Sequence, residues 1–169
     1  NTYLLYGVTG SGKTEVYMRI IADVLSRGKQ AIMLIPEIAL TYQTLMRFYR
    51  RFGDRVCVMN STLSKGEKYD LYEQALQGNV DIVIGPRSAL FTPFNDLGII
   101  IMDEEHDDSY ESAQIPRYHA RETAVHRGQV TGATVVLGSA TPSVESFSTA
   151  KNDEYILLPM PHRVGGRKL

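Results

Sequence analysis

One stretch near the beginning constrains the fold more than any other part of the sequence. Residues 7–14 are Gly-Val-Thr-Gly-Ser-Gly-Lys-Thr and fit the pattern G-x-x-x-x-G-K-[ST]. They directly follow the apolar residues 2–6 and precede a segment in which Val16, Ile20 and Val24 recur at helical spacing. A glycine-rich turn between a strand and a helix is the context that supports a phosphate-binding loop. The sequence therefore predicts an α/β domain that binds a nucleotide.

The residues of this loop have separable roles. Its glycines let backbone N–H groups point at phosphate oxygens, and the start of the helix adds positive potential. Lys13 can reach the β- and γ-phosphates, and the Thr14 hydroxyl can complete a Mg²⁺ shell. The alternative is a glycine-rich turn with a solvated lysine. The expected nucleotide-binding residues are Gly7, Thr9, Gly10, Ser11, Gly12, Lys13 and Thr14.

A group of acidic residues follows a later apolar segment. Residues 97–102 are followed by Asp103-Glu104-Glu105-His106. In a phosphate-loop fold an acid at that point holds Mg²⁺ opposite the Thr14 hydroxyl, and we assign this role to Asp103. Glu104 is placed to orient and deprotonate the water that attacks the γ-phosphate. The alternative is a solvated acidic turn. We therefore expect ATP and Mg²⁺ as cofactors, with Lys13, Asp103 and Glu104 as the catalytic residues.

Strand-like and helix-like segments alternate along the chain. Short apolar runs predict strands at residues 2–6, 30–35, 56–59, 80–84, 97–102 and 134–138. Helices are predicted at 16–24 closed by Gly28, around 45–52, from Ser64 to about Gln77, from Ala120 to about Val130, and at 143–150. Because such alternation is typical of parallel sheets, we expect a three-layer α/β fold with ligands at the carboxyl ends of the strands.

Composition narrows the class of protein. The 169 residues are 43% hydrophobic, and 18 Lys+Arg against 19 Asp+Glu give a net charge of -1. This composition argues against a disordered chain and against a protein that coats nucleic acid. The single cysteine, Cys57, excludes a disulfide framework and a multi-cysteine zinc site within the chain. No apolar run approaches the roughly 18 residues of a membrane span, so we expect a soluble, cytoplasmic protein with no membrane partner.

Longer strings resemble a known family. Asp103–His106 and Ser139-Ala140-Thr141 resemble motifs II and III of superfamily 2 helicases. The strings GVTGSGKTEVY, IPEIALT, IGPRSALF, DEEHD-x-SY, RYHAR and LGSATPS-x-ES, in this order along the chain, are similar to those of the bacterial primosomal replication-restart helicases. The resemblance implies the first RecA-like lobe of an ATP-dependent DNA helicase. We expect residues 1–158 to form this lobe and residues 159–169 to begin a linker to a second lobe.

The resemblance also implies roles for individual residues. The residues expected to contact DNA are Pro36, Glu37, Thr41, Arg87, Ser88, and, in an aromatic-rich loop at about 107–118, Tyr110, Arg117 and Tyr118. His106, Ser139 and Thr141 are expected to couple nucleotide state to DNA binding. The implied partners are single-stranded and forked DNA, other primosome proteins and the second lobe of the same protein. Zinc is expected only in a part of the family's proteins outside this chain.

Ordinary structural roles remain the alternatives for several of these residues. Arg87 can cap a neighbouring helix or pair with an acid, and Thr41 can cap the helix that follows it. Tyr110 and Tyr118 can be packing residues, although tyrosines can also stack on bases. For the whole chain, the alternatives are another superfamily 2 DNA translocase and a P-loop NTPase that is not a helicase.

Overall fold

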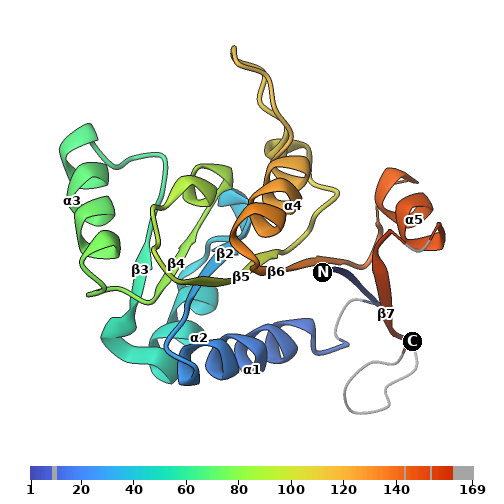
Figure 1. Cartoon of the computed structure of the whole chain (residues 1–169), viewed down its shortest axis with the longest axis horizontal. Coiled ribbons are helices and arrows are strands. Elements are labelled where there is room, and N and C mark those ends of the chain that lie inside the picture. Colours follow the sequence, from blue (N-terminus) through green and yellow to red (C-terminus); the bar gives the residue numbers. More distant parts are fainter. Residues whose placement is uncertain (9–10, 143, 153, 162–169) are drawn as a thin grey trace.

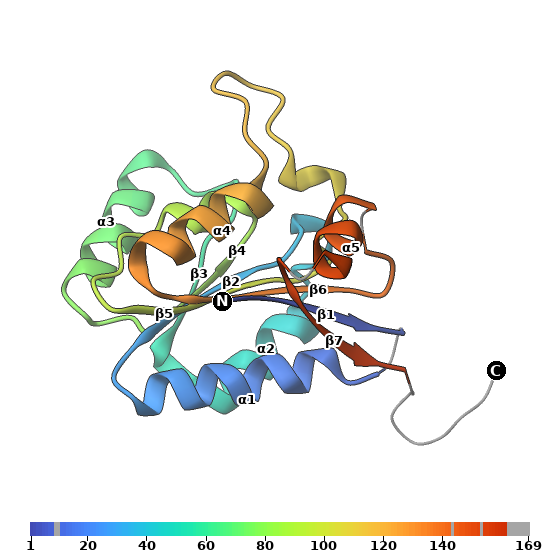
Figure 2. The ribbon, with the colours of Figure 1, turned by 45° about the vertical axis from the view of Figure 1, so that its right-hand side comes forward.

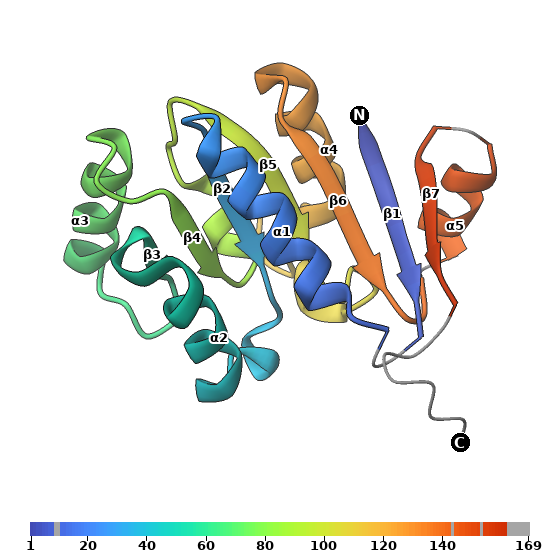
Figure 3. The ribbon, with the colours of Figure 1, turned by 90° about the horizontal axis from the view of Figure 1, so that it is seen from below.

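A parallel sheet forms the centre of the computed structural model, which describes residues 1–8, 11–142, 144–152 and 154–161. Its strand order is β3-β4-β2-β5-β6-β1-β7, and all the pairings are parallel (Figure 3). The strands are β1 (Thr2–Gly7), β2 (Gln30–Leu34), β3 (Val56–Val58), β4 (Ile82–Gly85), β5 (Leu97–Met102), β6 (Thr134–Ser139) and β7 (Ile156–Met160).

Helices cover both faces of the sheet. Figure 1 shows α1 and α2 on one side of it and α3, α4 and α5 on the other. The helices are α1 (Lys13–Ser26), α2 (Tyr42–Phe52), α3 (Lys65–Leu76), α4 (Ala120–Thr131) and α5 (Val144–Lys151). Short 3₁₀ turns are η1 (Glu37–Ala39), η2 (Gly53–Arg55), η3 (Arg87–Phe91) and η4 (Asp108–Tyr110). The predicted three-layer α/β fold is confirmed.

The central strands are apolar at consecutive positions because both of their faces are buried. In β5, Ile99 and Ile101 belong to the core beneath α1 and α2, whereas Ile100 and Met102 belong to the core beneath α3 and α4. All five residues of β2 are buried. Side chains alternate across a strand, so a strand covered on both sides needs apolar residues at every position.

The last strand was not predicted. Residues of β7 pair in parallel with β1, and the strand includes Pro159 and Met160, which the sequence analysis assigned to the linker. A proline is tolerated there because β7 is an edge strand. Ile156, Leu157 and Leu158 are 37–44% exposed at this edge. The remaining linker residues, from 162 onwards, lie outside the described residues.

A hairpin projects from the carboxyl edge of the sheet. We define it as residues 111–119, which connect η4 to α4 (Figures 1 and 2). Glu111 and His119 form an isolated antiparallel bridge, and the Ser112 N–H donates to the Tyr118 carbonyl at 2.8 Å. Within the described part of the chain, no helix is both long and apolar enough to cross a membrane.

Candidate nucleotide site

The phosphate loop connects β1 to α1 at the carboxyl edge of the sheet. Gly12 has a φ of 88° and precedes α1 without a side-chain cap, which leaves the first N–H groups of the helix open to an anion. At Gly7 a side chain has no room, since a Cβ atom would lie 2.5 Å from the Ser11 Oγ. That Ser11 hydroxyl is buried and has no hydrogen-bond partner among the described residues. Thr9 and Gly10 lie outside the described residues.

Lys13 folds back over the loop. Its Nζ donates to the Gly7 carbonyl at 2.8 Å and to the Val8 carbonyl at 3.4 Å. The ammonium group therefore lies over the loop instead of extending into solvent. A bound phosphate would compete with these two carbonyls for the Lys13 ammonium group.

Asp103 follows β5 directly and is held from several sides. Its N–H donates to the Leu34 carbonyl at 2.9 Å, which continues the pairing with β2. Its Oδ1 accepts a hydrogen bond from the Tyr17 hydroxyl at 2.9 Å. Burial raises the pKa of the Asp103 carboxyl, while the hydrogen bond from Tyr17 and the charge of Lys13 oppose that rise. Asp103 and Lys13 therefore lie within electrostatic reach of each other.

The oxygen donors at this edge suit Mg²⁺. A partly buried carboxylate with a raised pKa is stabilised by a nearby cation, and Thr14 at the start of α1 supplies a hydroxyl. Mg²⁺ in such sites is held by one or two protein oxygens together with substrate phosphates. Over the described ranges, no group of three or more His, Cys, Asp and Glu side chains is arranged to hold a metal by itself. One hydroxyl and one carboxylate match the small number of protein oxygens expected for Mg²⁺ that is also held by phosphates.

Glu104 turns the chain at the end of the strand. Its φ of 51° is in the left-handed region, which non-glycine residues adopt rarely. The turn leaves the Glu104 side chain half-exposed at the edge, 3.4 Å from the His106 Nε2, whereas the next residue, Glu105, is fully buried. The partial exposure of Glu104 suits a residue that binds a water molecule.

The three predicted coupling residues lie together. His106 Nδ1 and the Ser139 Oγ are 2.6 Å apart, and the same Oγ accepts a hydrogen bond from the Thr141 N–H at 3.0 Å. This arrangement connects the acidic segment after β5 with the loop after β6. The structure thus brings His106 next to Ser139, which lies 33 residues further along the chain, and to its neighbour Thr141.

The predicted DNA contacts after β2 have structural roles of their own. Thr41 caps α2, with its Oγ1 accepting from the Thr44 N–H at 3.3 Å. The Glu37 carboxylate accepts hydrogen bonds from the main chain and side chain of Ser61, which lower its pKa. Pro36, just before η1, is buried. Glu37 and Thr41 remain exposed, so these roles leave them accessible from solvent.

Arg87 fastens the hairpin to the domain. Its Nη1 donates to the carbonyls of Ser109 at 3.2 Å and Glu111 at 2.7 Å, and its guanidinium lies 5.8 Å from the centre of the Tyr118 ring. These carbonyls lie at the C-terminal end of η4, so Arg87 caps a neighbouring helical turn, which is one of the two structural alternatives for this residue. Phe91 packs edge-on against Tyr118 at 5.5 Å. Ser88, next to Arg87, has its Oγ 3.5 Å from the Met59 sulfur.

Tyr110 corrects one of the predicted DNA contacts. Its side chain is fully buried, and its hydroxyl donates to the Asp103 carbonyl at 2.6 Å. A buried ring has no face available for a base, so Tyr110 is a packing residue in this structure. Tyr118 is half-buried against Phe91 and Arg87, whereas Arg117 is exposed.

Four residues around the site were missed in the sequence. Tyr17, on α1, binds the carboxylate of Asp103. Glu105 is fully buried, and its Oε2 lies 3.3 Å from the Arg121 Nη1 and accepts from the Ser146 hydroxyl at 2.9 Å. In the sequence, Tyr17 lies within the apolar face of a predicted helix, and Glu105 lies in a run of acidic residues typical of an exposed turn. Neither pattern distinguishes these two residues from their neighbours.

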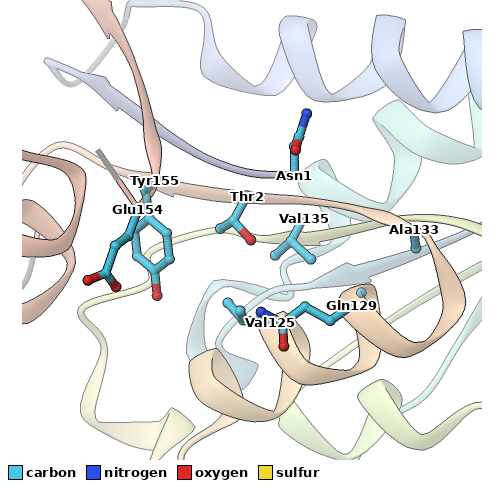
Figure 4. A pocket seen from close by; sticks show the side chains of 9 residues that line it. Asn1, Thr2, Val125, Gln129, Ala133, Val135, Glu154 and Tyr155 are labelled. Atoms are coloured by element: carbon cyan, nitrogen blue, oxygen red, sulfur yellow. The ribbon is translucent and has the colours of Figure 1, made fainter. Parts of the chain in front are cut away.

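A separate cavity lies far from the phosphate loop. It has a volume of about 510 Å³ and is bounded by the first residues of β1, by α4 and by the residues that precede β6 and β7 (Figure 4). Thr2, Gln129 and Tyr155 are among its lining residues. The cavity is therefore at the amino edge of the sheet, whereas parallel sheets bind ligands at the carboxyl edge. It is not part of the nucleotide site.

Known proteins resemble the chain in both sequence and fold. Replication restart protein PriA of Bacillus subtilis is 53% identical over 98% of this chain and 20% of its own length, and PriA of Chlamydia pneumoniae is 51% identical over 96% and 22%. The chain thus spans about a fifth of the length of these relatives.

Solved structures share the fold. RecG bound to a three-way DNA junction is 26% identical, with a TM-score of 0.67 over 98% of this chain and 21% of RecG. The Hef helicase domain of Pyrococcus furiosus has a TM-score of 0.69 at 17% identity over 98% of this chain and 36% of that one, which shows the fold alone. The family model described as DEAD/DEAH box helicase matches residues 1–149. Because this match spans most of the chain, the chain belongs to the DEAD/DEAH box helicase family.

Proposed function

We propose that the chain is the ATP-binding lobe of an ATP-dependent DNA helicase that acts in the restart of stalled replication forks. The observation that carries this proposal is that the phosphate loop and Asp103 lie at the same edge of the sheet, where Tyr17 on the helix that follows the loop donates a hydrogen bond to the Asp103 carboxylate at 2.9 Å. The similarity to PriA over nearly the whole chain supports the replication-restart role.

Hydrolysis of ATP needs each of these groups in a defined position. Thr14 and Asp103 would hold Mg²⁺, which neutralises charge on the β- and γ-phosphates. Lys13 exchanges its loop carbonyls for phosphate oxygens, and backbone N–H groups around Gly12 bind the rest of the phosphate chain. Glu104 orients the attacking water and accepts its proton. His106, with Ser139 and Thr141, transmits the state of the nucleotide to the DNA side.

The DNA partner is a single strand, within a forked substrate. Phosphate contacts are independent of base sequence and suit hydroxyl, main-chain and arginine donors at loop ends. The residues that we propose for DNA are Pro36, Glu37, Thr41, Arg87, Ser88, Arg117 and Tyr118. The complete protein would act in the bacterial cytoplasm with other primosome proteins, and it would carry zinc only outside this chain.

We infer that the proposed motor also needs a second lobe of the same protein. An arginine supplied in trans contributes about 10³–10⁵ to phosphoryl transfer, and we infer that a second lobe of the same protein supplies it. The isolated chain should therefore bind Mg-ATP weakly and show almost no turnover and no unwinding. Brisk DNA-stimulated hydrolysis by the isolated chain would refute this inference.

The decisive experiment measures Mg-ATP binding by calorimetry and ATP hydrolysis by a steady-state assay in the complete protein, each without DNA, with single-stranded DNA and with duplex DNA. We expect Mg-ATP to bind, and single-stranded DNA to stimulate its hydrolysis. Nucleotide binding that is indifferent to DNA would favour a P-loop NTPase that is not a helicase. Hydrolysis stimulated by duplex DNA without strand separation would favour another superfamily 2 translocase.

A further inference from the structure

We propose that Tyr17 is a positioning residue for the metal site, and that its hydroxyl fixes the carboxylate of Asp103 for Mg²⁺. This inference rests on the proposed function, because it assigns Asp103 to the metal. We do not assign Tyr17 as a ligand of the metal or of the nucleotide. It acts through one hydrogen bond, from its hydroxyl to the Asp103 Oδ1 at 2.9 Å.

The position of Tyr17 on α1 connects the two proposed metal ligands. Thr14 and Tyr17 are three residues apart, so they share a face of the helix that begins at Lys13. The helix that carries the Thr14 hydroxyl therefore also holds the carboxylate of Asp103. Partners of this kind, which hold a metal ligand without touching the metal, typically change metal affinity by about 10–100-fold when they are mutated.

Tyr17 is built to remain a neutral donor. Its side chain is fully buried. A tyrosine hydroxyl, with an ordinary pKa of about 10, carries its proton at physiological pH and can therefore donate to Asp103.

The Tyr17 hydroxyl packs against Gly138 of strand β6, where there is no room for a side chain. A Cβ atom at Gly138, near the end of β6, would lie 1.6 Å from the Tyr17 Oη. Any side chain at that position must displace the hydroxyl from Asp103. The requirement for glycine at the start of the Gly138-Ser139-Ala140-Thr141 segment follows from the placement of Tyr17.

Tyr110 provides a matched control within the same chain. It is also fully buried, and its hydroxyl also binds Asp103, but at the main-chain carbonyl, at 2.6 Å. Tyr17→Phe and Tyr110→Phe therefore each remove one buried hydroxyl from the same residue. Only Tyr17→Phe releases the carboxylate.

The test measures binding of N-methylanthraniloyl-ADP to the complete protein by fluorescence, once in Mg²⁺ and once in EDTA. In Tyr17→Phe we expect the gain in affinity that Mg²⁺ provides to fall about tenfold, with the affinity in EDTA unchanged. Raised Mg²⁺ should restore binding, which a general structural defect would not allow. Tyr110→Phe should keep the full gain, and Gly138→Ala should lose it as Tyr17→Phe does.

The outcomes separate this inference from the function on which it rests. A wild-type protein without any gain from Mg²⁺ would overturn the proposed function. A wild-type gain that Tyr17→Phe retains would overturn the role of Tyr17 and leave the function intact. An equal loss in Tyr17→Phe and Tyr110→Phe would also overturn it, because the effect would then not depend on the carboxylate.

Discussion

The nucleotide site and the hairpin of residues 111–119 are positioned by different means. At the nucleotide site the main chain places the functional groups, because Lys13 begins a helix and Asp103 ends a strand paired with β2. In the hairpin, the residues are placed by side chains that come from other elements of the fold. Arg87 of η3 holds the carbonyls at its base and packs on Tyr118. Motif residues at strand ends are thus placed by the sheet itself, whereas loop residues depend on distant partners.

The nucleotide site and the hairpin are connected through contacts to Asp103 and Glu105. From η4, at the base of the hairpin, Tyr110 donates its hydroxyl to the Asp103 carbonyl, and Arg121, just after the hairpin, lies against the buried Glu105. Movement of the hairpin would therefore act on both residues that flank Glu104.

The largest effect is expected at the nucleotide site. Lys13→Ala in the complete protein should lower ATP hydrolysis by about 10²–10³-fold or more, as expected when a donor to developing charge is lost. Single-strand affinity without nucleotide should not change, because the hairpin is held independently. A steady-state ATPase assay and a DNA-binding titration measure the two effects. Lys29→Ala, at an exposed lysine after α1, is the control. Near-normal hydrolysis in Lys13→Ala would remove the phosphate loop from the mechanism.

The second largest effect is expected for mutation of the ion pair Arg121–Glu105, which connects the hairpin to the acidic segment. Arg121→Met leaves the charge of Glu105 buried and should lower the free energy of unfolding by about 3–5 kcal/mol. Urea unfolding measures the loss. Combining it with Glu105→Gln, which removes the charge, should recover much of the stability. The exposed pair Arg27 and Asp23 supplies a control, since Arg27→Met should cost no more than about 0.5 kcal/mol. Equal costs at the two pairs would contradict the importance of burial.

Within the hairpin, two arginines should behave differently. Arg87→Ala removes hydrogen bonds to Ser109 and Glu111 and should cost about 1.5 kcal/mol, at the lower end for charged groups because Arg87 is half-exposed. Limited proteolysis should then cut the hairpin faster. Arg117→Ala should weaken single-strand binding without changing the rate of cleavage. Similar cleavage in both variants would show that Arg87 does not fasten the hairpin.

The smallest effect concerns pH at the start of α4. The Nδ1 of His119 accepts a hydrogen bond from the Arg121 N–H, and burial lowers the pKa of His119 below its usual 6.5. The unfolded state then binds more protons in this range, so the contribution of His119 is complete above about pH 6.5 and is lost as the pH falls through the folded pKa. His119→Asn keeps a cap but does not titrate. The free energy of unfolding should therefore fall less between pH 7.5 and 5.5 in this variant, and an identical fall would contradict the prediction.

The difference between groups placed by the main chain and groups placed by distant side chains also explains which features the sequence could predict. The strands around the site and the positions of Lys13 and Asp103 follow from local patterns, because an apolar run and a glycine-rich turn determine where a strand ends. β7 was missed since Pro159 and Pro161 are typical of a linker, and only an edge position next to β1 makes such a strand possible. The burial of Tyr110 and the partners of Arg87 depend on segments far away in the sequence, which no local pattern encodes.

Glu104, the half-exposed carboxylate next to Asp103, has the central role in the proposed hydrolysis of ATP. The most direct measurement is DNA-stimulated ATP hydrolysis and Mg-ATP affinity in the complete protein carrying Glu104→Gln. We expect ATP affinity to stay within about threefold of wild type, while hydrolysis falls by about 10²–10⁴-fold, the usual contribution of a general base. Hydrolysis close to the wild-type rate in this variant would contradict the role of Glu104 and would assign activation of the water to another group.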